Sequence, residues 1–480
     1  MITDEITLRL TQCFGHTPTA EQASAIRLFA RFLAHRNPHS LMLMRGSAGT
    51  GKSSLAGAFV RALALLGQKT VLMAPTGRAA KVFSLNSGGH AAFTIHRKIY
   101  RLRAFAGVGG EYNLNDNLHA DTLFMVDEAS MVANLVAADT TFGSGCLLDD
   151  LMQFIYSGQN CRLLLIGDKA QLPPVGEMES RALMASEIEA YGLDVYECDL
   201  NEVLRQSLDS GILWNATMIR ELISRDLQTQ LPIIHLKGFA DISVVRGPEL
   251  IEQIEASYSE VGIDETMIVT RSNKRANIFN EGIRSKVLWM EDEIASGDML
   301  MVVKNKYLNQ KSGATNEISF IANGDRAVVR YVSNVRELYG FRFADLTVEL
   351  TDYDNAEFKL TAILDTLYSE APALTDEQNT RLFYEVLADY ADITLKRERM
   401  KRIREDIHYN ALQVKFGYAV TCHKAQGGQW AHVYLDQGYM TSEMLTPEYI
   451  HWLYTAFTRA TEHLYLVNWP DNQLSDLSEQ

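Results

Sequence analysis

Short apolar runs separated by amphipathic segments dominate the first part of the chain. The runs lie at residues 41–44, 70–74, 122–126 and 162–166, and helix-forming residues follow them. Apolar runs of this length are typical of strands buried on both faces of a parallel sheet, with helices as the crossovers. Residues 1–206 are therefore predicted to form an α/β domain.

The second part of the chain repeats this pattern around an interruption. Strand-like runs at residues 266–270, 432–435 and 463–467 predict a second α/β domain, built from residues 207–326 and 411–480. The segment between them, residues 327–410, is different. In its first part, apolar and polar residues alternate and β-forming residues are frequent, which is typical of a small barrel. Its second part, residues 375–408, opens with a helix-capping signal and predicts a helix. A small β/α insertion is therefore expected inside the second domain.

A glycine-rich loop supplies the first candidate chemistry. Residues 46–53 read GSAGTGKS and match G-x-x-x-x-G-K-[ST] between a predicted strand and a predicted helix. Backbone N–H groups of such a loop surround a phosphate, and the helix N-terminus adds partial positive charge. Lys52 is predicted to reach the β and γ phosphates and Ser53 to bind Mg²⁺. The predicted nucleotide ligands are Gly46, Ser47, Ala48, Gly49, Thr50, Gly51, Lys52 and Ser53.

Two carboxylates end the predicted strand at residues 122–126. Asp127 is the candidate magnesium ligand, directly or through water, and Glu128 would orient or deprotonate the attacking water. A further predicted strand leads into the loop of residues 167–176, where Gln171 either senses the γ-phosphate or is an ordinary loop residue. Hydrolysis also needs arginine charge on the phosphoryl group. Arg205 and Arg459 are the candidates, with surface ion pairs as the alternative.

Composition limits the classes of protein that fit. At 480 residues the chain is expected to form more than one domain. Five cysteines without a C-x-x-C pair argue against a disulfide framework or zinc site, and a cytoplasmic bacterial or phage-encoded protein is expected. The formal charge of −15 counts against a polyanionic partner, although binding depends on local patches rather than on net charge.

Taken in order, these segments resemble the motifs of superfamily 1 DNA helicases of the RecD/Dda-like, 5′→3′ branch. The resemblance covers nearly the whole chain. Its segments are residues 17–22, 46–53, 74–81, 94–97, 127–130, 167–176, 202–206, 418–427 and 454–460. It implies two RecA-like parallel-sheet domains, with an SH3-like insertion in the second.

The resemblance also implies a function and roles for particular residues. The protein is expected to be an ATP-dependent 5′→3′ DNA helicase that acts as a monomer on single-stranded DNA and at single-strand/duplex junctions. Gln22 would read adenine, the alternative being an exposed polar residue. Arg205 and Arg459 become arginine fingers, and Gly427 joins the nucleotide site. The expected DNA contacts are Pro75, Thr76, Gly77, Arg78, Phe93, Thr94, His96, Asn273, Thr421, His423 and Lys424.

Several alternatives stay open at this stage. A short hairpin at residues 84–93 would act as the pin that splits the duplex, with Phe93 either stacking on a base or anchoring the hairpin. His96 and His423 contact DNA or face the core. Asn280 and Arg284 are expected to assist strand binding, and the basic run at 396–404 grips the strand or is a solvated face. RNA remains an alternative strand. A translocase without useful unwinding, a partner-dependent subunit and a P-loop switch or kinase are the competing functions.

Overall fold

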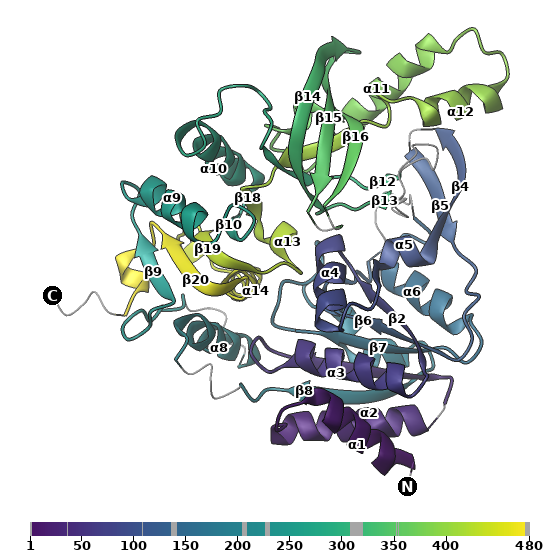
Figure 1. The fold of residues 1–480 in the computed structure, drawn as a ribbon, viewed down its shortest axis with the longest axis vertical. Helices are drawn as coiled ribbons and strands as arrows, with labels where there is room; N and C mark the ends of the chain where they lie inside the picture. Colours follow the sequence, from purple (N-terminus) through teal and green to yellow (C-terminus); the bar gives the residue numbers. More distant parts are fainter. Residues whose placement is uncertain are drawn as a thin grey trace.

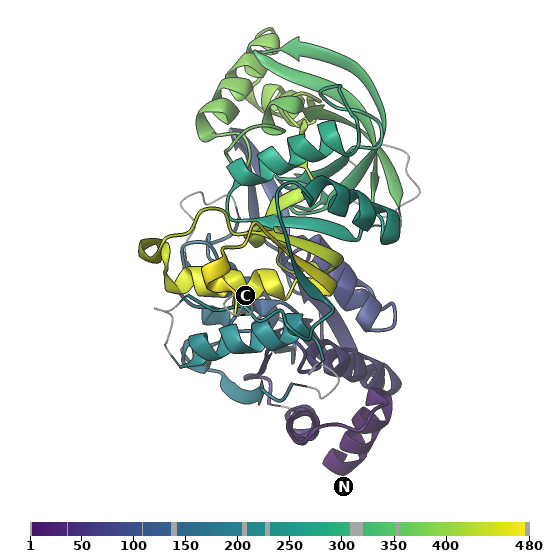
Figure 2. The same ribbon diagram turned by 90° about the vertical axis from the view of Figure 1, so that its left-hand side faces the viewer.

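The computed structural model describes residues 2–35, 37–107, 109–135, 142–203, 209–225, 231–307, 320–351, 353 and 355–475. Two parallel sheets and a closed barrel form the framework (Figure 1). The first α/β domain lies at the bottom of the view and the barrel at the top, with the second α/β domain beside them. The turned view in Figure 2 shows the same stacking. No helix among these residues is long and apolar enough to cross a membrane.

The first sheet has the order β3-β2-β6-β7-β1-β8, and all of its pairings are parallel. Its central strand shows why an unbroken apolar run was informative. Met42 and Met44 pack into the core on one face, and Leu41 and Leu43 pack into the core on the other. The strands are β1 (Ser40–Gly46), β2 (Lys69–Ala74), β3 (Ala92–Thr94), β6 (Thr122–Val126), β7 (Arg162–Gly167) and β8 (Asp194–Leu200).

Helices cover both faces of this sheet. One face carries α1 (Ile2–Phe14), α2 (Ala20–Ala34) and α3 (Lys52–Leu65), and the other carries α5 (Ile95–Ile99), α6 (Leu147–Tyr156) and α7 (Ala185–Glu189). A two-stranded antiparallel ribbon, β4 (Tyr100–Gly107) and β5 (Gly109–Leu114), projects from the domain.

The hairpin expected at residues 84–93 is wrong. Helix α4 (Gly77–Asn86) runs through the first of these residues, and β3 pairs in parallel with β2. Gly88 and Gly89 adopt φ of +75° and +82°, and the Gly89 N–H donates to Ser84 O at 2.9 Å. The two glycines therefore end helix α4 and do not form a hairpin turn; both structures commonly contain glycines in the left-handed conformation.

The second sheet is also parallel, with the order β18-β10-β19-β20-β9. Its strands are β9 (Ile242–Val245), β10 (Thr266–Thr270), β18 (Ala419–Thr421), β19 (Trp430–Asp436) and β20 (Ala460–Val467). Its helices are α8 (Gly211–Ser224), α9 (Leu250–Glu260), α10 (Asn273–Lys286), α13 (Cys422–Ala425) and α14 (Pro447–Phe457). The predicted second α/β domain is thus confirmed in its fold.

The barrel is wider than the insertion expected at residues 327–410. It closes in the order β11-β14-β15-β16-β17, and its first and last strands, β11 (Met299–Val302) and β17 (Leu412–Phe416), lie outside that range. Both strands are buried along their whole length, so they lack the alternation that marked β14 (Arg326–Leu338), β15 (Phe341–Leu350) and β16 (Ala356–Ile363). The single helix expected at 375–408 is two, α11 (Asp376–Asp389) and α12 (Lys396–Glu405), and α11 begins with the expected capping box.

Candidate nucleotide site and nucleic-acid face

The glycine-rich loop lies between the end of β1 and the start of α3. Gly51 is the N-cap of α3 with φ +82°, and a side chain there would lie 2.7 Å from Gln22 Nε2, so glycine is required on both counts. The Lys52 ammonium donates to Gly46 O at 2.5 Å and to Ser47 O at 2.9 Å. The lysine therefore lies folded over the loop whose phosphate it is expected to hold.

Gln22 is buried beneath this loop, so the exposed alternative for this residue is wrong. It is 2% exposed. Its side-chain oxygen accepts from the Thr19 N–H at 3.0 Å, and its amide group donates to Thr50 O at 2.9 Å. The first pair is half of a capping box at the start of α2, and the T-x-x-Q spacing of Thr19 and Gln22 is its sequence signal. Gln22 thereby ties α2 to the loop, and adenine recognition stays a prediction.

The two acidic residues after β6 lie at the carboxyl edge of the sheet. The Asp127 N–H donates to Met73 O at 3.0 Å, and Asp127 Oδ1 accepts from the Glu128 N–H at 2.9 Å. Glu128 has φ +52°, a strained conformation of the kind that gathers at functional sites. Burial, and next the charge of Glu128, raise the pKa of Asp127 to about 7. A divalent cation would offset this cost, and the carboxylate with the exposed Ser53 hydroxyl is the hard oxygen set that Mg²⁺ prefers.

The loop after β7 brings two more polar side chains to this edge. Asp168 Oδ2 lies 4.0 Å from Lys52 Nζ. Gln171 is 6% exposed, and within the described residues its side-chain oxygen is buried without a hydrogen-bond partner. Leaving a buried acceptor unsatisfied costs about 1–3 kcal/mol. The arrangement suits a donor arriving with the substrate, such as the attacking water.

Helix α14 of the second domain contacts this site directly. The Tyr454 hydroxyl donates to Asp168 Oδ2 at 2.6 Å and accepts from the Ala48 N–H at 3.0 Å. One residue along, Thr455 Oγ1 accepts from the Leu172 N–H at 2.7 Å. No local sequence signal marks these contacts, because their partners lie hundreds of residues apart along the chain.

Arg459, one of the two expected arginine fingers, has its partners inside its own domain. Arg459 is 2% exposed, and its guanidinium donates within its own domain to Thr455 O and Gly428 O, each at 2.9 Å. Arg205 lies outside the described residues. Arg220 of α8 reaches the loop instead, and donates to Ser47 Oγ at 2.7 Å and to the side chain of Asn201.

Gly427 connects the second domain to the start of α4. Its φ is +73°, and a side chain there would lie 2.9 Å from Ala79 Cβ and 3.1 Å from Thr76 Oγ1. Beside it, Arg78 stacks on Trp430 at 4.4 Å and donates to Gln429 O at 2.6 Å. The turn at residues 75–78 therefore lies at the interface between the two α/β domains.

Three of the expected DNA contacts line one small groove, whose free volume of about 10 Å³ holds at most one water molecule. Asn273, Thr421 and Lys424 line it between α10, β17 and β18, together with Lys415. The Asn273 amide donates to Glu370 O at 3.1 Å. The Lys424 ammonium is buried without a partner among the described residues, and burial, then the charge of Lys415, lower its pKa to about 8.

The expected contacts on the first domain have structural tasks as well. Thr76 caps α4 by accepting from the Ala79 N–H at 3.2 Å, and Thr94 caps α5 by accepting from the Arg97 N–H at 3.3 Å. Phe93 is half-buried, with the Lys98 ammonium 5.3 Å from its ring.

The two histidines differ in surroundings. His96 packs against the rings of Tyr100 and Phe142 at 5.6 and 5.2 Å, and burial lowers its pKa to about 4, which matches the core-facing alternative. His423 of α13 is half-buried, and burial lowers its pKa while the charge of Glu448 raises it.

Asn280 and Arg284 hold the second domain together. The Asn280 side chain exchanges hydrogen bonds with the backbone of Ala419, at 2.7 and 3.0 Å. Arg284 forms a buried two-point ion pair with Asp298 at 2.8 and 2.9 Å. Both side chains therefore have structural partners, Asn280 also lines the groove, and the strand contact stays a prediction for both.

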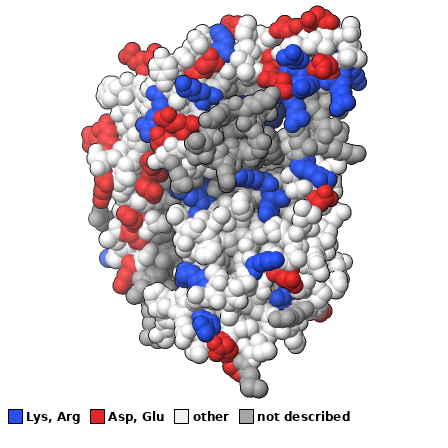
Figure 3. Space-filling view, turned by 45° about the vertical axis from the view of Figure 1, so that its right-hand side comes forward, with Lys and Arg blue, Asp and Glu red and all other residues white. Residues whose placement is uncertain are grey.

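Positive charge gathers away from the acidic bulk of the molecule. Figure 3 shows Lys and Arg clustered at the upper right of one face, with some Asp and Glu among them, on the side where Figure 1 has α12; along the left edge Asp and Glu predominate. The exposed basic residues of α12 are Lys396, Arg397, Lys401, Arg402 and Arg404. A local basic patch thus coexists with the negative net charge.

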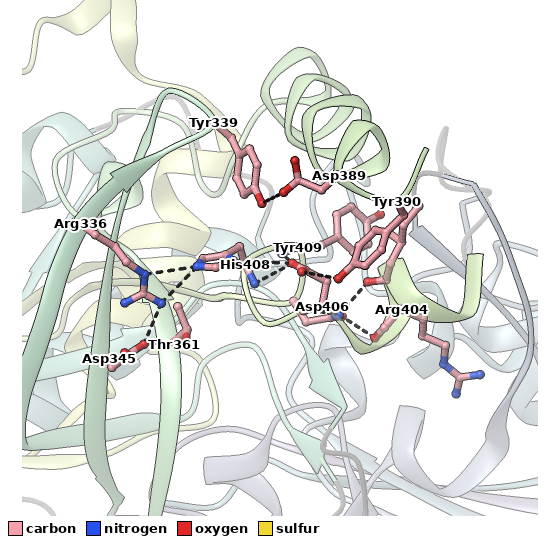
Figure 4. Close-up of polar contacts among 12 residues, drawn as sticks. Arg336, Tyr339, Asp345, Thr361, Asp389, Tyr390, Arg404, Asp406, His408 and Tyr409 are labelled. Atoms are coloured by element: carbon pink, nitrogen blue, oxygen red, sulfur yellow. Dashed lines mark hydrogen bonds and ion pairs between the residues drawn. The ribbon is translucent and has the colours of Figure 1, made fainter. Parts of the chain in front are cut away.

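A polar network holds α12 against the barrel (Figure 4). Arg336 of β14 donates to His408 Nε2 at 3.2 Å and pairs with Asp345 at 3.0 Å. Asp406, at the end of α12, accepts from the His408 N–H at 2.9 Å and from the Tyr390 hydroxyl at 3.0 Å. Burial and the neighbouring Arg336 guanidinium lower the pKa of His408, although Asp406 raises it. A neutral His408 accepting from Arg336 fixes the helix on the barrel.

The fold and the site define a P-loop nucleotide-binding protein in which a second parallel-sheet domain contacts the phosphate loop. A family model described as an AAA domain matches residues 17–231, and one described as the UvrD-like helicase C-terminal domain matches residues 416–467. The chain therefore carries an AAA domain and a UvrD-like helicase C-terminal domain, and it is related to the RecD2 and Dda helicases.

Relatives share about a quarter of their residues with this chain over most of its length. An uncharacterized protein of Acanthamoeba polyphaga mimivirus is 23% identical over 93% of this chain and 98% of its own length. The ATP-dependent DNA helicase dda of Enterobacteria phage T4 is 24% identical over 73% of this chain and 78% of its own. The ATP-dependent RecD2 DNA helicase of Deinococcus radiodurans is 27% identical over 64% of this chain, which spans 40% of that protein.

Solved structures of Pif1 helicases are also similar to this chain. The Bacteroides Pif1 helicase in complex with ADP-AlF3 and ssDNA has a TM-score of 0.47 and 13% identity, and the match covers 95% of this chain and 94% of that one.

Proposed function

We propose that this protein is an ATP-dependent DNA helicase that moves 5′→3′ on single-stranded DNA and unwinds duplex. The observation that carries the proposal is the contact of Tyr454 with Ala48 and Asp168. It places the second domain against the phosphate loop. A nucleotide bound there changes the contacts between two domains, which is what a motor needs and what a single-domain P-loop switch or kinase lacks. The direction of movement rests on the resemblance alone.

In this proposal the nucleotide is held where the two domains meet. The loop N–H groups and Lys52 hold the phosphates, and Glu128 and Gln171 orient the attacking water. Ser53 and Asp127 would hold Mg²⁺, which supplies positive charge to the phosphates when bound. Arg459, and Arg205 outside the described residues, remain the proposed arginine fingers. For Arg459 this requires its guanidinium to leave two backbone carbonyls.

The strand is proposed to bind in the groove that Asn273, Thr421 and Lys424 line. Amide, hydroxyl and ammonium groups contact phosphates without reading bases, which suits an enzyme that moves over any sequence. Phe93 is proposed to stack on a base from the first domain, since such stacking is sequence-tolerant. Differential affinity of ATP for two arrangements of the domains would drive their alternating grip.

The test is unwinding of partial duplexes that carry either a 5′ or a 3′ single-stranded tail, with ATP and Mg²⁺. We expect unwinding from the 5′ tail only, and none with Lys52→Ala. Strand-stimulated ATPase without unwinding would favour a translocase or a partner-dependent subunit. Normal unwinding by Lys52→Ala would overturn the assignment of the site. An RNA tail in the same assay tests the alternative strand, and sedimentation with and without the duplex tests the proposed monomer.

The cytoplasmic location is likewise a proposal. It rests on the scattered, unpaired cysteines, all five of which are free thiols in this structure.

A further inference from the structure

Tyr454 occupies an unusual place for a tyrosine of the second domain. It is 1% exposed, and its hydroxyl lies between two groups of the first domain: the Ala48 N–H of the phosphate loop and the Asp168 carboxylate. That same carboxylate oxygen lies 4.0 Å from the Lys52 ammonium. The hydroxyl therefore sits on the side of the loop where Lys52 meets the terminal phosphates of a nucleotide.

The hydroxyl and a phosphate oxygen would use the same partners. The Ala48 N–H now donates to Tyr454, and an incoming phosphate oxygen is a stronger acceptor because it is charged. Burial and the nearby Asp168 carboxylate raise the pKa of Tyr454 well above its usual value, so the hydroxyl stays protonated and can donate. A γ-phosphate can thus replace the phenol oxygen at Ala48 and accept the phenol proton that Asp168 accepts now. No covalent bond changes in this exchange.

Arg220, also of the second domain, brings positive charge to Ser47, the loop residue next to Ala48. It donates to Ser47 Oγ at 2.7 Å, and its charge acts on Tyr454. Because α8 and α14 pack together, the two side chains belong to one rigid surface of the second domain. The guanidinium has further donors with which to follow an anion bound at the loop.

We propose that Tyr454 and Arg220 form the surface by which the second domain distinguishes a nucleoside triphosphate from a diphosphate: Tyr454 donates to the terminal phosphate, and Arg220 supplies charge beside it. This inference rests on the proposed ATP site. It adds two residues to the second domain's contribution, beyond the arginine fingers implied by the motifs. ADP lacks the group that the hydroxyl would contact, so removal of the hydroxyl weakens triphosphate binding selectively.

The test is competitive displacement of a fluorescent ADP analogue by ATPγS and by ADP, with Mg²⁺, on the full chain. Tyr454→Phe keeps the ring and removes only the hydroxyl. We expect its preference for ATPγS over ADP to fall about tenfold or more relative to the unchanged protein, which corresponds to one hydrogen bond to a charged group. ADP affinity should change by less than about twofold. Arg220→Gln should lower the same preference, and Arg220→Lys should restore part of it.

The matched control is Tyr449→Phe. Tyr449 lies on the same helix, is 3% exposed, and donates its hydroxyl hydrogen bond at 2.6 Å to Gln437, away from the loop. A merely structural role for Tyr454 would lower the melting temperature in both variants and leave the ATPγS-to-ADP ratio unchanged in both. That result would overturn the inference. If the unchanged protein bound neither nucleotide, the proposed function itself would fail.

Discussion

Each of the two α/β domains has its own parallel sheet, but the helix that follows the first core strand is capped differently in the two. After β1, the N-cap of helix α3 is Gly51. A glycine has no side chain with which to cap the helix, so the first N–H groups of α3 are available to a ligand. After β10, the N-cap of helix α10 is Ser272, whose side chain accepts a hydrogen bond from the Arg275 N–H at 3.2 Å. The difference teaches that one domain is built to bind an anion at its helix N-terminus. The other satisfies that terminus itself and sends side chains across the interface.

If the chemistry belongs to the first domain, removal of one carboxylate there should have the largest effect. Glu128→Gln keeps the size of the side chain but removes the base, so ATP hydrolysis should fall by about 10²–10⁴-fold. ATP binding should persist, because the phosphate contacts come from the loop. Phosphate release under single-turnover conditions measures the first quantity and nucleotide displacement the second. Activity within a fewfold of the unchanged protein would assign the base to another residue.

If the second domain's buried charges are structural, breaking one should lower stability instead of strand affinity. Arg284→Ala leaves Asp298, which is fully buried, without its partner, and should cost about 3–5 kcal/mol of unfolding free energy. Urea unfolding followed by circular dichroism measures this loss. Lys274→Ala on the same helix is the control, since its exposed pair with Glu370 at 3.8 Å is worth at most about 1 kcal/mol. Unchanged stability with weaker binding of single-stranded DNA would instead support the strand contact predicted for Arg284.

The contrast between the domains also explains what the sequence could predict. The strands predicted in the two parallel sheets match the structure to within two residues at each end, β6 and β10 to the residue, because an unbroken apolar run marks them; the exception is β20, which begins three residues earlier than predicted. The edge strand β8 was missed, since half of its length is polar and exposed. The loop and the carboxylates were predicted because their chemistry is local to a strand end.

Side chains that act across an interface carry no such local mark. Tyr454 and Arg459 lie in the same short motif, and the sequence favoured the arginine because phosphoryl transfer requires positive charge. In the structure the tyrosine reaches the loop, whereas the arginine donates to carbonyls of its own domain. Only the packing of α14 against the first domain decides between them, and that packing depends on residues spread over the whole chain.

Proton competition at the proposed Mg²⁺ site of the first domain gives a smaller, pH-dependent effect. The pKa of Asp127 is raised to about 7, so the protonated form is favoured in the folded protein. Stability from this form is present below about pH 4 and is lost as the pH rises through 7. Mg²⁺ needs the carboxylate, so its affinity should fall about tenfold from pH 8 to pH 6.

The measurement is the rise in melting temperature with Mg²⁺ concentration at the two pH values. Asp127→Asn is the control, and it should show no difference between them. Equal Mg²⁺ affinity at pH 6 and pH 8 in the unchanged protein would contradict a titrating ligand at this position.

The smallest effect is expected from a substitution of Lys424, a buried charge of the second domain that lacks the kind of partner Arg284 has in Asp298. Unlike Arg284, Lys424 keeps its ammonium buried with no hydrogen-bond partner among the described residues, which costs stability unless a ligand arrives. Lys424→Met should therefore leave the melting temperature unchanged or raise it, while single-stranded DNA binds a fewfold more weakly. The slope of log affinity against log salt should fall in magnitude by about 0.7, which is one phosphate contact on a single strand. Fluorescence anisotropy across a salt series measures both quantities. A lower melting temperature with an unchanged slope would mean that Lys424, like Arg284, holds the domain together.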